Sequence, residues 1–136
     1  MNPEDLGLPH RPPFVFVDTV HEIEAGTSAR GVKTFAGSDP MFAGHFPGNP
    51  LVPGVILTEA LAQMAGLAAG QEGRRFLLSA IRSMKFPEAA RPDEQISLSA
   101  AKTGSMGGLW MFETRATVGD RIVAEGVIVL NEATAV

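Results

Sequence analysis

The spacing of hydrophobic residues changes along the chain and predicts two strands, then one helix, then about four further strands. Phe14 to Val20 is rich in aromatic and β-branched residues, which favours a strand, and a weaker strand follows from Ser28 to about Ala36. Val55 to Ala69 contains only three polar residues, so we expect a helix that is buried on most sides. Beyond Arg75, apolar and polar residues alternate, as they do in strands with one buried face.

The alternation after the helix is clearest in three stretches, which turns rich in glycine separate. The predicted buried positions are Ile96, Leu98 and Ala100, then Trp110 and Phe112, then Ile122, Ala124, Ile128 and Leu130. Turns are expected at Gly104 to Gly108 and at Val118 to Asp120. This pattern indicates an α+β fold in which a curved antiparallel sheet wraps one central helix. We expect a single domain over residues 1–136.

Composition and charge exclude several classes of protein. The chain has no cysteine, so it holds no disulfide, no thiolate metal site and no cysteine nucleophile. A net charge of −4 argues against a nucleic-acid-binding protein. The longest apolar stretch, Leu51 to Ala69, is interrupted by Pro53, Gly54 and three polar residues, so it does not predict a membrane span. The acidic N-terminus lacks the pattern of a secretory signal, and we expect a cytoplasmic protein.

The segment from Gly37 to Pro53 is dense in glycine and proline, which predicts a long, rigid loop without regular structure. Loops of this length in compact domains are usually functional. His45 lies inside this loop, where a restricted backbone holds its side chain in place. Taken alone, His45 is either a structural loop histidine or a general base.

Glu59 is anomalous because it lies in the second turn of an otherwise apolar helix, and glutamate is almost never buried without a partner. Burial favours the neutral acid, the form that a general acid needs; alternatively, Glu59 faces a solvent channel or a neighbouring subunit. Gln63, one turn later, either orients Glu59 or a water, or is a satisfied buried amide. Gly54 either offers its N–H to an oxyanion at the helix start or is a simple turn glycine.

A base, an acid and a backbone donor within a short stretch suit the abstraction of a proton next to a carbonyl, with loss of a leaving group. Neither of the other two histidines is expected to be catalytic. His21 neighbours Glu22 and is predicted to be a solvated surface residue. His10 lies between Pro9 and Arg11, where a structural role is favoured over a catalytic one.

Residues 44–63 read GHFPGNPLVPGVILTEALAQ, which is similar to the signature GHFPGxPxxPGVxxxEAxAQ of FabZ-type 3-hydroxyacyl-[acyl-carrier-protein] dehydratases. The lead from Leu8 to Asp18 resembles LPHRxPFxxVD of the same family. The resemblance covers essentially the whole chain. It implies the hot-dog fold, a curved antiparallel sheet around one long helix, and a homodimer that forms edge to edge. The family also commonly assembles as a trimer of dimers.

The resemblance also implies a role for each matching residue. His45 and Glu59 stand at the positions of the catalytic histidine and carboxylate, and Gly54 at that of the glycine whose N–H binds the thioester carbonyl. The family's active site lies at the dimer interface and pairs the histidine of one chain with the carboxylate of the other. Glutamate rather than aspartate favours dehydration without isomerisation. The residues expected to bind substrate are Phe46, Pro53, Gly54, Val55 and Gln63.

The activity implied is dehydration of a (3R)-3-hydroxyacyl thioester on acyl carrier protein to the trans-2-enoyl thioester, in fatty-acid or related lipid or polyketide biosynthesis. No metal or organic cofactor is needed. Carrier proteins are acidic, and positive charge that can dock them follows the helix. The candidate docking residues are Arg74, Arg75, Arg82, Lys85 and Arg91.

The chain departs from the family between Ser79 and Glu94, where the usual glycines and first aspartate are missing. It also has no tyrosine, so any aromatic gate is a phenylalanine such as Phe76. Two alternatives remain. A hot-dog thioesterase uses the helix carboxylate as base or nucleophile and does not need the histidine. A non-catalytic acyl-binding module lacks the paired acid and base that this chain keeps.

Overall fold

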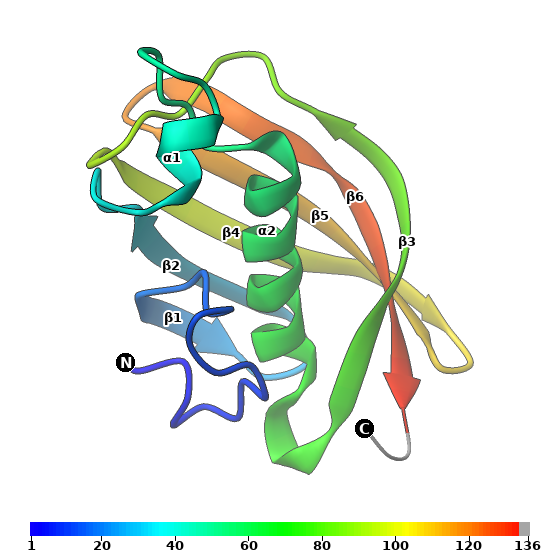
Figure 1. The fold of residues 1–136 in the computed structure, drawn as a ribbon. Helices are drawn as coiled ribbons and strands as arrows, with labels where there is room; N and C mark the ends of the chain where they lie inside the picture. Colours follow the sequence, from blue (N-terminus) through cyan, green and yellow to red (C-terminus); the bar gives the residue numbers. More distant parts are fainter. Residues whose placement is uncertain (134–136) are drawn as a thin grey trace.

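Six antiparallel strands curve around one long helix in the structure, a computed structural model that describes residues 1–133 (Figure 1). In chain order the elements are β1 (Thr19–Glu24), β2 (Ser28–Thr34), α1 (Met41–Gly44), α2 (Gly54–Ala69), the short 3₁₀ helix η1 (Gln71–Gly73), β3 (Arg75–Lys85), β4 (Gln95–Met106), β5 (Leu109–Val118) and β6 (Arg121–Ala133). The predicted order of two strands, a central helix and four strands is therefore confirmed, as is the α+β class.

The strand order in the sheet is β1-β2-β4-β5-β6-β3. Strand β4 pairs with β2 although α2 and β3 lie between them in the sequence, because the chain crosses the concave face of the sheet as α2 before it returns (Figure 1). Among residues 1–133, strand β3 pairs only with β6 and so forms the far edge of the sheet. The long helix is thus covered by the sheet on one side and open along another.

Helix α2 and the inner face of the sheet make the core. Leu61 and Met64 of α2 are fully buried, and they meet the inward side chains of β4 and β5, including Leu98 and Phe112. Each such side chain contributes on the order of 1.5–3 kcal/mol through burial. The predicted alternation holds along β4 and β5 but breaks in β6, where a bulge buries Val123 together with its neighbour Ala124.

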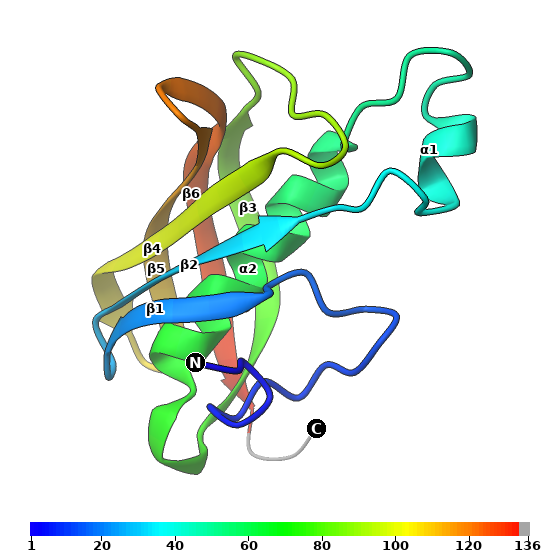
Figure 2. The same ribbon diagram turned by 90° about the vertical axis from the view of Figure 1, so that its left-hand side faces the viewer.

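Two segments differ from their predictions. The strand expected from Phe14 begins only at Thr19, because the backbone N–H of Phe16 and the carbonyl of Phe14 bond the Gln63 side chain instead of a neighbouring strand. The loop expected to lack regular structure contains the single turn α1, whose Phe42 is buried in the core. The rest of that loop is irregular and projects with α1 beyond the end of the sheet (Figure 2).

The edge strand β3 is long and largely exposed over its eleven residues. Leu77 and Ile81 are 52% and 51% exposed, which is unusual for large apolar side chains within a strand. An unpaired apolar edge of this kind is a template for pairing with another chain. Over residues 1–133, no helix is both long and apolar enough to span a membrane.

Candidate active site

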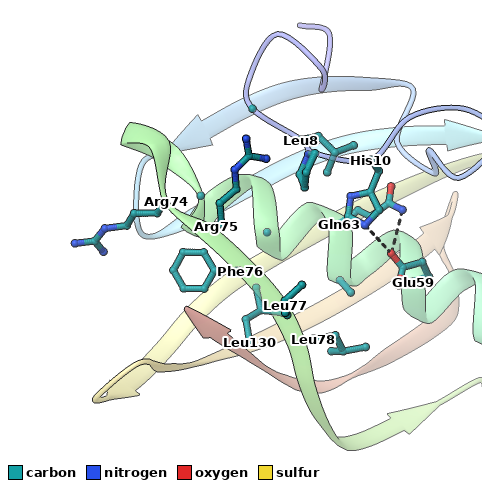
Figure 3. Close-up of a pocket in the computed structure, with 15 residues that line it drawn as sticks. Leu8, His10, Glu59, Gln63, Arg74, Arg75, Phe76, Leu77, Leu78 and Leu130 are labelled. Atoms are coloured by element: carbon teal, nitrogen blue, oxygen red, sulfur yellow. Dashed lines mark hydrogen bonds and ion pairs between the residues drawn. The ribbon is translucent and has the colours of Figure 1, made fainter. Parts of the chain in front are cut away.

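Glu59 lies on the open side of α2 and borders a cavity of about 290 Å³ (Figure 3). Its side chain is 23% exposed, so the carboxylate is half-buried and faces the cavity, in keeping with the alternative that it faces a solvent channel or a neighbouring subunit. Besides Glu59, α2 lines the cavity through Ala62, Gln63 and Gly66, which follow at the spacing of one helix face. The remaining lining residues are Gly7, Leu8, Pro9, His10, Gly70, Arg74, Arg75, Phe76, Leu77, Leu78 and Leu130.

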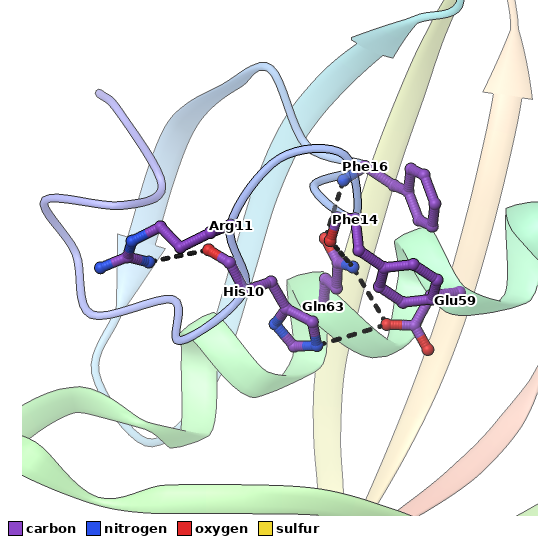
Figure 4. Close-up of polar contacts among 6 residues, drawn as sticks. All are labelled: His10, Arg11, Phe14, Phe16, Glu59 and Gln63. Carbon is purple, nitrogen blue, oxygen red and sulfur yellow. Dashed lines mark hydrogen bonds and ion pairs between the residues drawn. The ribbon is translucent and has the colours of Figure 1, made fainter.

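Gln63 holds Glu59 in place from within the same helix (Figure 4). The Phe16 N–H donates to Gln63 Oε1 at 2.8 Å, and a backbone N–H needs an acceptor, so the orientation of the amide is fixed. Gln63 Nε2 then donates to the Phe14 carbonyl at 3.1 Å and to Glu59 Oε2 at 3.0 Å. Since Oε2 accepts a hydrogen bond from Gln63, Oε1 is the oxygen of Glu59 left open to carry a proton. Gln63 is therefore a satisfied buried amide that also orients Glu59.

His10 approaches the same carboxylate oxygen from the N-terminal segment (Figure 4). Its Nε2 lies 3.6 Å from Glu59 Oε2, while its Nδ1 is buried and has no hydrogen-bond partner within residues 1–133. The His10 ring thus faces the oxygen that Gln63 holds, and it stacks on Phe14 at a centroid distance of 6.1 Å.

His10 was not expected at the site, because no local spacing links positions 10 and 59 in the sequence. The signal that was available is the lead motif from Leu8 to Asp18, which matches the same family as the motif that contains Glu59. His21, by contrast, is exposed on β1, as predicted.

His45 is half-buried in the loop before α2, and its ring is fixed on both sides. Its Nδ1 lies 3.1 Å from the Leu51 carbonyl oxygen. A carbonyl oxygen only accepts, so Nδ1 carries the ring proton and Nε2 keeps the lone pair that a base requires. Phe46, which is 49% exposed, stacks on the ring at a centroid distance of 4.0 Å.

Helix α2 begins at Gly54, directly after Pro53, as the Pro-Gly pair predicts. The first-turn N–H groups of a helix have no intrahelical acceptor and lie at the positive end of its dipole. A Cβ at Gly54 would lie 3.0 Å from the ring of Phe86, so a side chain there would require this ring to shift slightly. Val55, next in the helix, is 77% exposed.

The structure brings together only part of the predicted site within one chain. Glu59 and Gln63 are in contact and share the cavity with His10. His45, Phe46, Pro53, Gly54 and Val55 lie in the loop and at the start of α2, outside the lining of that cavity. Within residues 1–133, no hydrogen bond or ion pair joins His45 to Glu59. Within a single chain, the candidate base His45 and the candidate acid Glu59 therefore lie at separate places and do not form one site.

Replacing Gln63 tests how firmly this amide holds the N-terminal segment. We expect Gln63→Met to lower the free energy of unfolding by about 2–4 kcal/mol, because the Phe16 N–H and the Phe14 carbonyl lose their partner. Urea unfolding measures the change, with Gln95→Met on the exposed start of β4 as the matched control. Equal unfolding midpoints for the two variants would show that the bonds of Gln63 do not stabilise the fold.

Comparison with known proteins defines the class. A family model described as a FabA-like domain matches residues 8–127, so the chain belongs to the FabA-like family. Within that family it is of the FabZ type. It is 39% identical over 125 residues to the 3-hydroxyacyl-[acyl-carrier-protein] dehydratase FabZ of Verminephrobacter eiseniae, covering 87% of this chain and 83% of the relative. It is 40% identical over 121 residues to the FabZ of Thermoanaerobacter sp. strain X514, covering 86% and 85%.

Solved structures of low sequence identity share the fold. The dehydratase heterocomplex ApeI:P from Xenorhabdus doucetiae superposes with a TM-score of 0.79 at 14% identity, covering 99% of this chain and 93% of that one. A hypothetical thioesterase with coenzyme A from Streptococcus pneumoniae gives a TM-score of 0.70 at 11% identity, covering 85% and 84%. The fold is therefore the hot dog, as the sequence resemblance implied.

Proposed function

We propose that this chain dehydrates (3R)-3-hydroxyacyl thioesters carried on acyl carrier protein, as its FabZ relatives are named to do, with His45 as base and Glu59 as acid. The reaction forms the trans-2-enoyl thioester and belongs to fatty acid biosynthesis. The observation that carries the proposal is the placement of Glu59: its carboxyl group borders a cavity and is held through Oε2 by Gln63, which leaves Oε1 free to face a substrate.

In the proposed reaction, His45, Glu59 and Gly54 each have a separate role. Nε2 of His45 removes the proton from C2 of the substrate, and the electron pair of that bond forms the C2–C3 double bond. The C3–O bond breaks, and the departing hydroxyl takes the proton from Oε1 of Glu59 and leaves as water. The N–H of Gly54 steadies the enolate-like thioester oxygen. The proton on His45 then returns to Glu59 through water, which restores both groups without any cofactor.

A second copy of the chain completes the site in this proposal. His45 and Glu59 do not meet within one chain, and the family resemblance implies a homodimer in which they meet across the interface. The exposed apolar edge of β3, with Leu77 and Ile81, supports edge-to-edge pairing. Each Glu59 then faces His45 of the partner subunit, and two equivalent sites form per dimer.

The carrier protein is expected to dock at the basic residues that follow α2, of which Arg74 and Arg75 line the cavity. Arg75, Arg82 and Lys85 are exposed on β3, and Arg74 lies at the cavity with 47% of its side chain exposed. Arg91 is exposed near the start of α2 and donates to the Asn49 side chain at 3.2 Å. Charge of this sign attracts an acidic carrier despite the net charge of −4.

The direct test compares substrates and products. The purified protein is given 3-hydroxyoctanoyl thioesters on acyl carrier protein and on coenzyme A, and enoyl formation is followed by ultraviolet absorbance while free thiol is measured in parallel. We expect enoyl product without thiol release, and a higher kcat/KM for the carrier thioester than for the coenzyme A thioester. Thiol release without enoyl product would identify a thioesterase and overturn the proposal, and binding without either product would identify an acyl-binding module.

A further inference from the structure

The connection between β2 and α2, residues 35–53, carries His45 and projects beyond the end of the sheet (Figure 2). We call this segment the base loop. Between Ala36 and Gly48, only Phe42 is buried. A segment with so few buried contacts opens locally at little cost in free energy. Hydrogen bonds from elsewhere in the chain therefore decide how firmly the base loop is held.

The connection between β3 and β4 supplies such bonds near both ends of the base loop. At the start of the loop, the Asp93 N–H donates to the Phe35 carbonyl at 2.8 Å, and the Gly37 N–H donates to Asp93 Oδ1 at 3.0 Å. At the end of the loop, the Val52 N–H donates to the Ala90 carbonyl at 2.8 Å. The β3–β4 connection thus holds the base loop on both sides of its histidine.

A series of hydrogen bonds within the base loop joins these points to His45. The Asp39 N–H donates to the Ala36 carbonyl at 2.9 Å, and Asp39 Oδ1 accepts the Met41 N–H at 3.0 Å. The Met41 carbonyl in turn accepts the His45 N–H at 3.0 Å. On the other side, the Leu51 N–H donates to the His45 carbonyl at 2.9 Å, and the Leu51 carbonyl binds the ring Nδ1. Because each bond spans only a few residues, a shift at either end of the loop reaches the backbone and the ring of His45.

The backbone of Asp93 is in a conformation that favours glycine. Its φ is 67°, and within residues 1–133 no other non-glycine residue has a positive φ. Glycine adopts this conformation without steric cost, so an aspartate there calls for a reason. Packing does not supply one, because the Asp93 side chain is exposed. The bond from the Gly37 N–H to its carboxylate does, since glycine at this position would offer no acceptor.

We propose that Asp93 is a positioning residue: its bond to the Gly37 N–H holds the base loop in the arrangement that presents Nε2 of His45 to the substrate. The catalytic part of this inference rests on the proposed function, in which His45 is the base. A displacement of about 1 Å at a reacting group is enough to cost about a hundredfold in rate. Loosening the loop therefore lowers kcat, although Asp93 itself touches no reacting atom.

Asp93→Gly and Asp93→Asn separate the side-chain bond from the backbone. Glycine suits a φ of 67° but accepts no bond, whereas asparagine tolerates this conformation and offers its amide oxygen to the Gly37 N–H. We expect Asp93→Gly to unfold in urea at the midpoint of the unmodified protein or above it. Its kcat for the 3-hydroxyoctanoyl carrier thioester should fall by about fivefold to fiftyfold, with KM within about twofold. Asp93→Asn should keep most of the kcat.

Amide hydrogen exchange, followed by mass spectrometry, measures the hold on the loop without any substrate. Base-loop peptides that contain the bonded N–H groups of His45 and Leu51 should exchange about fivefold to fiftyfold faster in Asp93→Gly than in Asp93→Asn. Peptides from β5 should exchange at equal rates. The matched control is Asp120→Gly in the exposed turn between β5 and β6, which removes the same charge and should change neither kcat nor loop exchange.

The two measurements separate the possible failures. Equal loop exchange in folded Asp93→Gly and in the unmodified protein would show that Asp93 does not hold the base loop. Faster exchange with an unchanged kcat would overturn its role in catalysis, and an Asp93→Asn enzyme as impaired as Asp93→Gly would overturn the role of the bond. Absence of dehydration by the unmodified enzyme would overturn the proposed function and the catalytic role with it, while the exchange rates still test the hold on the loop.

Discussion

Glu59→Gln is expected to lower kcat for dehydration by on the order of 10²- to 10⁴-fold, the contribution of a positioned general acid. The glutamine amide has nearly the shape of the carboxylic acid, and its oxygen can still accept the Gln63 N–H that is 3.0 Å from Glu59 Oε2. The amide nitrogen then replaces Oε1 and has no acidic proton for the departing hydroxyl. The substitution thus removes the chemistry and keeps the contacts. Enoyl formation from the carrier-bound substrate, followed by ultraviolet absorbance, gives kcat and KM separately.

The control for this variant is Glu22→Gln, an equal change on the exposed side of β1, which should leave kcat unchanged. Circular dichroism and urea unfolding verify that both variants fold. His45→Ala should lose activity to a similar extent, and the double variant should be little worse than either single one, because the base and the acid act as a unit. A folded Glu59→Gln enzyme that keeps a substantial share of its kcat would contradict the assignment of Glu59 as the acid.

The order of the elements could be predicted from the sequence because each element carries its own periodicity. The alternation along β5, with Trp110 and Phe112 turned inward, needs only the two-residue repeat of a strand. The lead from Phe14 to Val17 shows the limit of this reasoning. Its aromatic, β-branched composition is that of a strand, yet the Gln63 side chain takes the backbone bonds that a neighbouring strand would have made. A tertiary contact from α2 overrides the local propensity there.

The candidate site was also predictable only where its contacts are local in the sequence. Glu59 and Gln63 stand out because two polar residues one turn apart interrupt an apolar helix, and their contact follows from helix geometry alone. The approach of His10 to Glu59 depends on where the N-terminal segment crosses α2, which no spacing encodes. The relation of His45 to Glu59 is further removed, because the proposal assigns the two groups to different chains.

If His45 and Glu59 of different subunits form each site, two inactive variants should complement each other. When His45→Ala and Glu59→Gln subunits are combined in one dimer, we expect activity to reappear although each variant alone is nearly inactive. One site of the mixed dimer then holds an intact His45 and an intact Glu59 from different subunits, while the other site lacks both groups. Each mixed dimer has one working site out of two, so the purified mixed dimer should show about half of the unmodified activity per dimer.

The experiment co-expresses the two variants with different affinity tags and purifies the mixed dimer through both tags in turn. The control combines His45→Ala subunits with subunits that carry both substitutions; this mixed dimer has no intact pair in either site, so no activity should return. If the doubly tagged His45→Ala and Glu59→Gln dimer forms but stays inactive, the two groups do not meet across an interface. If activity returns in that dimer and not in the control, the active site must be shared between two subunits. The exposed edge of β3 and the half-buried carboxylate of Glu59 would then both lie at the interface of one dimer. In that assembly, the partner subunit supplies the base that a single chain does not bring to its own acid.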